Sequence, residues 1–186
     1  EIKDLINKII EKPENSVVAK RVKRSEGLIF QTLYQIHKLI TLIFTGKKVN
    51  FGNYSCLTKK DINILSNKAS LWSSFSGTIK KNLTSLNETD SIRGLRYYGP
   101  SKMSLLNLVI HSFSIIAVFK YTVFLRSALI IIFLSFLINT LGLIAIVFQF
   151  LIVFFNLLIF IVSMRENQKA LIESNNNLLN ENEITH

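Results

Sequence analysis

The sequence predicts an α/β domain followed by an amphipathic interfacial helix and a two-helix transmembrane hairpin. In residues 1–98, helical apolar patterns alternate with short strand-like runs. In residues 99–120, a cationic turn leads into a helix with one polar stripe, and residues 121–164 contain Arg126 as their single charge. The polar residues 165–186 form the predicted tail, a short helical extension that frays.

The first predicted elements are two helices separated by a strand. Apolar residues repeat at helical spacing through residues 2–12, and Pro13 ends this helix. The run SVVAKR, at residues 16–21, predicts a short buried strand with a basic end. A second amphipathic helix is expected within residues 25–46, because Gly46 is a typical helix stop.

The rest of the α/β domain is predicted from shorter signals. Residues 47–57 form a strand or loop, and a short helix follows Thr58, which stands three residues before Asp61 as in a capping box. Residues 70–83 predict a further helix that Gly77 interrupts. Helices thus alternate with short strands, as in the second half of an α/β domain. No other strand is expected, so the strands that would complete the sheet are missing from the prediction.

The helix at residues 103–119 has polar residues at spacings of three, four and three: Ser104, Asn107, His111 and Ser114. A helix that is apolar except along one line is typical of a membrane interface. The alternative is a third membrane span, because its length is just sufficient.

Residues 121–164 are too long for one straight membrane helix, since about 20 residues cross the hydrocarbon core. The turn signal at residues 139–142 divides them into spans at 121–140 and 143–164. Cations flank both outer ends of this hairpin, so the positive-inside rule places both ends and the basic domain in the cytoplasm. We therefore expect a protein with two spans in a bacterial inner membrane.

The charge balance restricts the classes of partner. The formal net charge is +10, and most of the excess lies before residue 127. Such a surface beside a membrane segment favours anionic lipid headgroups or phosphate-bearing ligands, and no nucleic-acid-binding module is visible. Cys56 is the single cysteine, so no intrachain disulfide can form. No Cys, His or carboxylate residue stands at metal-ligand spacing from His37 or His111 in the sequence.

The stretch SIRGLRYYGPSKMS, at residues 91–104, is the strongest candidate binding motif. A turn at Gly99 precedes a predicted helix start, and Arg96, Ser101 and Lys102 surround it. Free backbone N–H groups together with these side chains suit a phosphate or diphosphate. Simple attachment to anionic headgroups explains the same residues equally well.

Two weaker candidate sites lie earlier in the chain. Arg21 ends the predicted strand at residues 16–21, and Arg24 and Ser25 follow it. Ligands bind at strand ends in open α/β sheets, although a solvated loop is the alternative. In FGNYS, Asn53 offers both a hydrogen-bond donor and an acceptor beside a glycine.

Taken together, VVAKRVKRSE, FGNYSCL and RYYGPSKM, followed by two predicted spans, resemble the C-terminal half of membrane-bound family 2 glycosyltransferases. The relatives in question transfer sugars to dolichol phosphate or undecaprenyl phosphate, and the resemblance covers nearly all of residues 1–164. It implies a GT-A fold, a divalent metal (Mg²⁺ or Mn²⁺), a nucleotide-sugar donor and a lipid-phosphate acceptor.

The resemblance also implies roles for individual residues. Arg96, Ser101 and Lys102 would contact the donor diphosphate or the acceptor phosphate. Asn53 stands where many members have an acidic residue, which makes it the candidate catalytic position, whereas Arg21, Arg24 and Ser25 would lie near the acceptor phosphate.

The paired aspartates that hold the metal in that family are absent from this sequence. They belong to the family's N-terminal half, so the sequence is expected to be a fragment that is inactive by itself.

Two other functions remain: a non-enzymatic basic adaptor that binds anionic lipid headgroups, and, less favoured, a membrane-tethered nucleic-acid binder. A homo-oligomer also remains open, because Gly142 belongs to no small-residue packing pattern.

Overall fold

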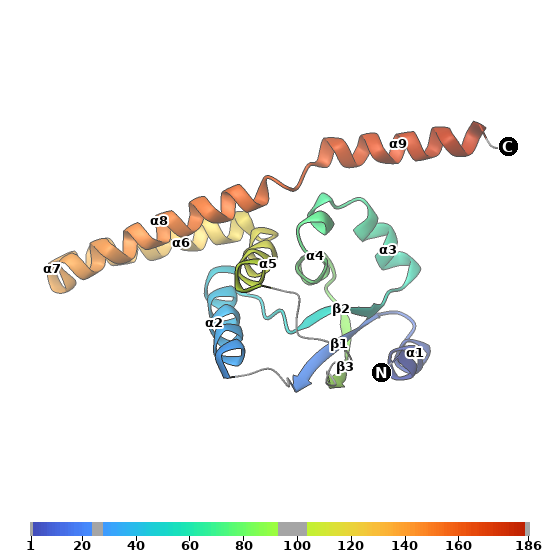
Figure 1. Cartoon of the computed structure of the whole chain (residues 1–186), viewed down its shortest axis with the longest axis horizontal. Coiled ribbons are helices and arrows are strands. Elements are labelled where there is room, and N and C mark those ends of the chain that lie inside the picture. Colours follow the sequence, from blue (N-terminus) through green and yellow to red (C-terminus); the bar gives the residue numbers. More distant parts are fainter. Residues whose placement is uncertain (1, 24–27, 93–103, 185–186) are drawn as a thin grey trace.

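The computed structural model describes residues 2–23, 28–92 and 104–184, which form a mixed α/β fold of mostly helices around a small sheet (Figure 1). The sheet has three strands in the order β2-β1-β3: β1 Ser16–Lys23, β2 Phe51–Cys56 and β3 Leu86–Ile92. β1 pairs antiparallel with β2 and parallel with β3. The strand predicted at residues 16–21 is confirmed, and residues 47–57 do contain a strand.

β3 was not expected from the sequence. Its residues, LNETDSI, are mostly polar and lack the apolar alternation that indicates a half-buried strand. Backbone pairing along the whole length of β1 holds it in the sheet, and Lys20 and Glu88 form an ion pair of 3.2 Å across the two strands. The neighbouring strand therefore determines this element.

Both faces of the sheet are covered by helices. Val17 and Ala19 of β1 pack against Leu5 of α1 (Ile2–Glu11), while Val18, which points to the opposite face, packs against Ile79. Ile79 lies in α4 (Phe75–Asn82), and α3 (Lys59–Ser66) adds Leu65 to the same cluster. The predicted helix at residues 2–12 is confirmed, and it covers one face of the sheet.

A hydrogen-bond network joins the start of β1 to the start of α3. The Ser16 hydroxyl donates to Asp61 Oδ2 at 2.5 Å and accepts from the Thr58 N–H at 3.0 Å. The Asp61 N–H in turn donates to Thr58 Oγ1 at 3.2 Å, which confirms the predicted helix start. Ser16 is fully buried and Asp61 nearly so. This network therefore satisfies polar groups that water does not reach.

The predicted helix at residues 70–83 breaks at a different place than expected. A short 3₁₀ helix, η1 (Ala69–Trp72), precedes α4, and Ser74 caps α4 by accepting from the Gly77 N–H at 3.2 Å. Gly77 itself lies within the continuous helix. A Cβ at this position would come 3.1 Å from Ile115 O and 3.1 Å from the Val118 side chain. The glycine therefore permits close approach of two helices and does not end one.

α2 (Leu28–Thr45) ends at Gly46, as predicted, with φ of +69°. The Arg126 guanidinium lies directly over Gly46 and donates to Ile43 O at 3.0 Å. Arg126, the charge inside the predicted first span, therefore satisfies one carbonyl group in the last turn of α2 and attaches this helix to α6.

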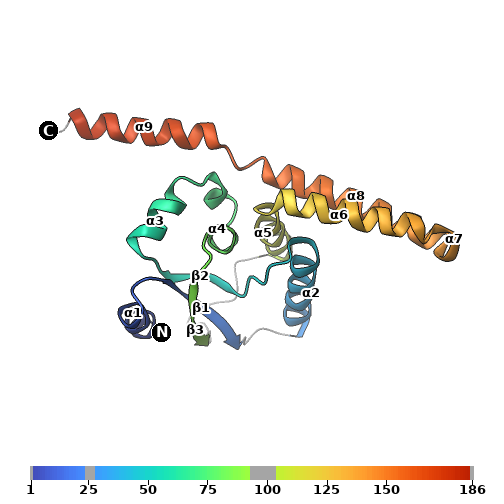
Figure 2. The same ribbon diagram turned by 180° about the vertical axis from the view of Figure 1, so that it is seen from behind.

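Four helices form the apolar part of the described chain: α5 (Leu105–Ala117), α6 (Lys120–Phe136), α7 (Ile138–Leu141) and α8 (Leu143–Ser163). α5 and α6 meet at a bend of 90°. α6 and α8 lie side by side in both views (Figures 1 and 2), and Gln149 Nε2 of α8 donates to Ser135 Oγ of α6 at 2.9 Å. The predicted turn at residues 139–142 coincides with α7 and with Gly142, whose φ is +55°.

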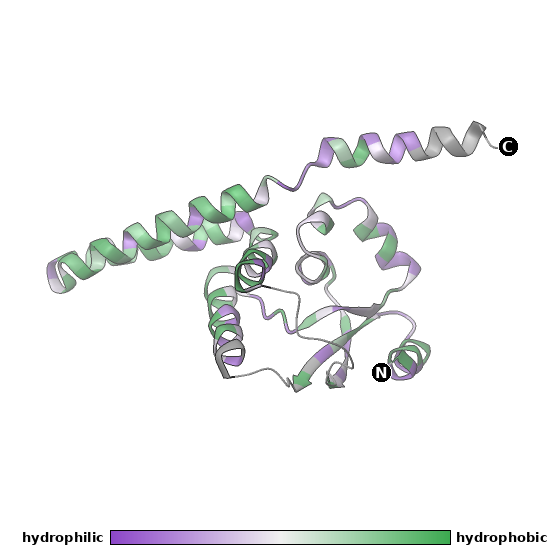
Figure 3. Cartoon of the chain, in the orientation of Figure 1, coloured by the Kyte–Doolittle hydropathy of each residue, from purple (hydrophilic) through white to green (hydrophobic). Residues whose placement is uncertain are grey.

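By length and composition, one helix of the described chain can cross a membrane. It runs from Leu143 to Asn177 and includes α8 and the first part of α9 (Gln168–Ile184). α5 and α6 meet the same criterion only when they are counted together across their bend. Most hydrophobic side chains of α6 and α8 point outward, so the pair is apolar along its length, whereas α9 is mixed (Figure 3).

The polar stripe expected on residues 103–119 does not face one environment. Ser104 caps the exposed start of α5 by accepting from the Asn107 N–H at 3.2 Å, whereas Ser114 is buried in the fold. Apolar residues are exposed in the first half of α5, among them Leu105, Leu106 and Val109.

The Ser16–Asp61 network predicts a stability difference between two serines. Ser16→Ala removes the hydroxyl that donates to Oδ2 of the buried Asp61, so the free energy of unfolding should fall by about 1–3 kcal/mol. The matched control is Ser66→Ala, an exposed serine on α3, which should change stability by less than about 0.5 kcal/mol. Denaturant unfolding in detergent, followed by circular dichroism, measures both. Equal effects would contradict the buried network.

Candidate functional site

Most of the predicted site residues lie outside the described part of the chain. This applies to Arg24 and Ser25 in the second cluster and to Arg96, Ser101 and Lys102 in the cationic stretch. Their proposed proximity to one another therefore stays a prediction.

The two remaining predicted residues lie in the sheet. The backbone of Arg21 pairs with Ser91 of β3. Asn53 is exposed on β2 and lines a shallow hollow of about 310 Å³ with Ile2, Leu5 and other residues of α1 and β2. That hollow has no charged side chain in its lining, so it offers no cation for a phosphate.

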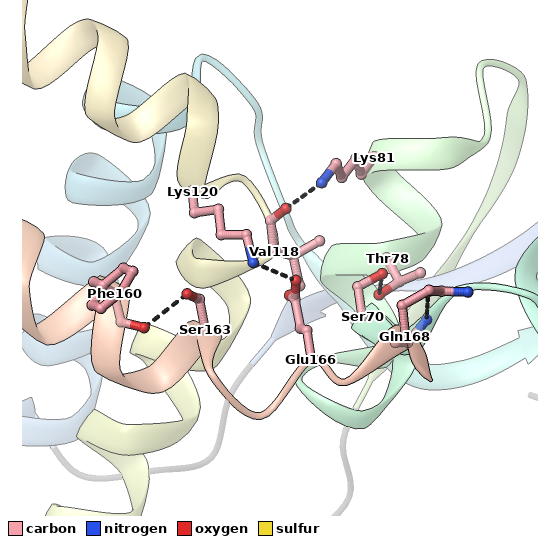
Figure 4. Close-up of polar contacts among 10 residues, drawn as sticks. Ser70, Thr78, Lys81, Val118, Lys120, Phe160, Ser163, Glu166 and Gln168 are labelled. Carbon is pink, nitrogen blue, oxygen red and sulfur yellow. Dashed lines mark hydrogen bonds and ion pairs between the residues drawn. The ribbon is translucent and has the colours of Figure 1, made fainter. Parts of the chain in front are cut away.

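A second cleft, also of about 310 Å³, lies where α4, the start of α6 and the linker between α8 and α9 meet. Among the described residues, the four charged side chains in its lining are Lys68, Lys81, Lys120 and Glu166. Figure 4 shows that Lys81, Lys120 and Glu166 come together from different elements around Val118. This polar cleft is the candidate functional site.

Lys81 lies in the last turn of α4 and reaches the C-terminal end of α5. Its Nζ donates to Val118 O at 2.6 Å, and Val118 is the C-cap residue of α5 (Figure 4). Because the last carbonyls of a helix lack intrahelical partners, an ammonium group there stabilises the helix end.

Lys120 and Glu166 form the largely buried ion pair of the cleft. Lys120 Nζ donates to Glu166 Oε2 at 3.2 Å, and the two side chains are 20% and 11% exposed. The pair connects the first residue of α6 to the linker that follows α8. The second oxygen, Glu166 Oε1, is buried and has no hydrogen-bond partner among the described residues.

Gln168 attaches the start of α9 to the α/β domain. Its Oε1 accepts from the Ala69 N–H at 3.3 Å, and its Nε2 donates to Asn67 O at 3.1 Å. Beside it, Thr78 Oγ1 donates to Ser70 Oγ at 3.0 Å (Figure 4). These bonds hold the linker of Glu166 against the loop that carries Lys68, and so they define the shape of the cleft.

The electrostatics of the cleft favour an anion. Desolvation lowers the pKa of Lys81 below 10.5; Glu166 opposes this effect, and the positive charges of Lys120 and Lys68 add to it. Lys81 still contacts solvent, so a ligand can reach it. A negative group in the cleft would relieve the repulsion among the three amines.

Sequence reasoning missed this site because its members are far apart in the chain. Lys81 stands beside Lys80, and Lys120 stands just before the predicted first span, but neither pattern links the two lysines to one site. Glu166 follows the predicted second span and belongs to no motif. Among the described residues, no group of three or more His, Cys, Asp or Glu side chains could hold a metal.

In comparisons with protein-family models, curated proteins and solved structures, nothing matches this chain. The resemblance to glycosyltransferases therefore rests on the sequence motifs alone.

The arrangement predicts how Lys81 titrates. In a ¹³C-methylated sample, the Lys81 signal should titrate below 10.5, because its charged form is desolvated. Glu166→Gln should move the pKa of Lys81 further down, since it removes the attraction that opposes desolvation. Glu11→Gln on α1 is the matched control. NMR titration measures both variants, with Lys81→Arg used for assignment. An unchanged or raised pKa in Glu166→Gln would contradict the described contacts.

Proposed function

We propose that this chain is the membrane-attached C-terminal part of a family 2 glycosyltransferase. The complete enzyme would transfer a sugar from a nucleotide-sugar donor to polyprenyl phosphate or another membrane-associated acceptor. The observation that carries the proposal is the position of the cationic stretch at residues 91–104. It connects β3 of the α/β domain to α5, the first of the apolar helices.

The finer fold assignment belongs to this proposal. In the sheet order β2-β1-β3, both β2 and β3 are edge strands among the described residues. Edge strands present unpaired backbone groups on which further strands can add. A GT-A domain would be completed there by strands from the N-terminal half, which would also supply the paired aspartates for the metal.

Helix lengths support a transmembrane hairpin. α8 has 21 residues, so it is about 32 Å long, close to the hydrocarbon thickness of about 30 Å. α6 has 17 residues and runs beside it. Lys120 and Arg165 lie at the domain end of the pair, which under the positive-inside rule places that end in the cytoplasm.

The bend before α6 supports an interfacial position for α5. If α6 crosses the bilayer, a helix at 90° to it runs along the membrane surface. α5 has 13 residues, about 20 Å, which is too short for the hydrocarbon core. Leu105, Leu106 and Val109 on its exposed first half would enter the lipid boundary.

In the proposed mechanism, the acceptor phosphate attacks the anomeric carbon of the sugar directly, and the nucleoside diphosphate leaves. Arg96 and Lys102 would hold the phosphate groups and stabilise the charge on the leaving group, with Ser101 as a hydrogen-bond donor. The Mg²⁺ or Mn²⁺ would stabilise the same diphosphate from ligands outside this sequence. Arg21, Arg24 and Ser25 would orient the acceptor.

Asn53 is assigned a positioning role in this scheme. Its amide can donate and accept hydrogen bonds, but it cannot take up a proton as a carboxylate does. It would therefore orient the acceptor without acting as a general base.

One observation favours the second candidate function, a basic adaptor that binds anionic headgroups without catalysis. The cleft of Lys68, Lys81 and Lys120 lies at the base of the apolar helices and needs no reaction to explain it.

Membrane insertion of α8 can be tested by paired arginine substitutions. Val153 is exposed at the middle of α8 and Met164 is exposed at its end. Val153→Arg should reduce the fraction retained after carbonate extraction, because an arginine at the bilayer centre costs about 2.5–3.5 kcal/mol. Met164→Arg should be retained like the wild type, since its side chain reaches the interface. Equal retention of both variants would argue against a span.

The catalytic proposal is tested in the full-length enzyme. Arg96→Ala and Lys102→Ala should each lower sugar transfer to polyprenyl phosphate by about 100-fold, because each removes a cation from the developing charge. Lys60→Ala, an exposed lysine on α3, is the control and should retain the wild-type rate. If both test variants keep that rate, the assigned roles are wrong.

A further inference from the structure

We propose that the cleft of Lys68, Lys81, Lys120 and Glu166 binds a phosphodiester headgroup that also carries a hydrogen-bond donor, such as phosphoethanolamine or phosphoglycerol. The proposal rests on the membrane position of α8 proposed above. It concerns residues to which the sequence motifs assign no role.

The phosphate component follows from the three amines. They come from the loop between α3 and η1, the end of α4 and the start of α6, so they surround the cleft from different directions. An ammonium group has three N–H donors. Lys81 uses one on Val118 O and Lys120 uses one on Glu166, which leaves donors for a tetrahedral anion with several acceptor oxygens.

The donor component follows from Glu166. Its carboxylate would repel a bare phosphate, and Lys120 already holds Oε2. Oε1 is buried with no partner among the described residues, which is costly for a carboxylate oxygen. An ethanolamine ammonium or a glycerol hydroxyl beside the phosphate would supply the missing donor.

The position of the cleft indicates lipid as the source of this headgroup. Because α8 is about as long as the hydrocarbon core is thick, Ser163 at its end lies at the hydrocarbon boundary. Glu166 and Gln168 follow within the next few residues, at the depth of headgroup phosphates. Tyr121, which lines the cleft, is 75% exposed, and aromatic residues of this kind are enriched at that depth.

A purely structural function does not account for the whole cluster. Attaching the linker to α6 requires only the Lys120–Glu166 pair. Lys81 caps the end of α5 through Val118 O, but neither Lys81 nor Lys68 has a carboxylate within ion-pair distance among the described residues, and both face the same cleft. Their repulsion is unfavourable in the empty cleft and becomes favourable attraction when an anion binds.

The test uses native mass spectrometry of the full chain in detergent with added lipids. Lys68→Met/Lys81→Met should retain phosphatidylethanolamine about 30-fold more weakly than the wild type, because two charged donors to the phosphate are lost; that ratio is about 2 kcal/mol at tenfold per 1.4 kcal/mol. Lys59→Met/Lys60→Met, with the same charge change on α3, should lose less than about 3-fold. Diacylglycerol, which has no phosphate, should not be retained. Equal retention by both double variants, or retention of diacylglycerol, would overturn the proposal.

Two lipids that differ in one property test the function of Glu166. Phosphatidylethanolamine and phosphatidylcholine are both zwitterionic, but only the first has N–H donors. The wild type should prefer phosphatidylethanolamine, and Glu166→Gln should reduce this preference. If the wild type shows no preference, the donor component is wrong.

A soluble analogue distinguishes the source of the ligand and separates this proposal from the proposed function. Displacement of bound lipid by millimolar glycerophosphoethanolamine would show that the phosphodiester alone suffices, whereas no displacement would assign the site to lipid. If carbonate extraction releases the wild-type protein from the membrane, the proposed membrane function is wrong. Headgroup binding is then tested separately by ³¹P NMR with the soluble analogue. Binding that is lost in Lys68→Met/Lys81→Met would support the proposed phosphodiester site, and absence of binding would overturn that proposal.

Discussion

The structure depends on the packing of residues 115–119, at the end of α5, between the α/β domain and the apolar helix pair. Ile116, Ala117 and Val118 are almost completely buried. On one side Gly77 of α4 lets the backbone of α5 approach closely, and on the other Val123 and Ile159 complete the same core cluster. In a close-packed interior, a shift of one segment shifts the segments packed against it. The packing of residues 115–119 therefore determines where the apolar helices leave the α/β domain.

The polar cleft is a consequence of that junction. The bend between α5 and α6 exposes Val118 O to Lys81 and places Lys120 at the next helix start, where the linker after α8 brings Glu166. Largely buried ion pairs contribute little net stability, because desolvation offsets their attraction. The Lys120–Glu166 pair is therefore better understood as an interaction that specifies geometry than as a source of stability.

Local signals predicted local structure well. Thr58 and Asp61 predict a helix start because their hydrogen bonds lie within one turn, and Gly46 predicts a helix end because a positive φ favours glycine. β3 was missed because its pairing partner, β1, lies about 70 residues away, and no feature of LNETDSI alone indicates a strand. Gly77 was misinterpreted because a glycine that ends a helix and one that admits a neighbouring helix look alike in a sequence.

The sequence by itself determined where most of the helices lie, where the apolar run lies, and that cations precede it. These properties depend on the residue types themselves and on interactions between residues a few positions apart, so they can be recognised from the local sequence. The tertiary structure decided that Lys68, Lys81, Lys120 and Glu166 share one cleft, and that α5 turns by 90° into α6. Those outcomes depend on packing between distant segments, for which a single sequence contains no separate signal.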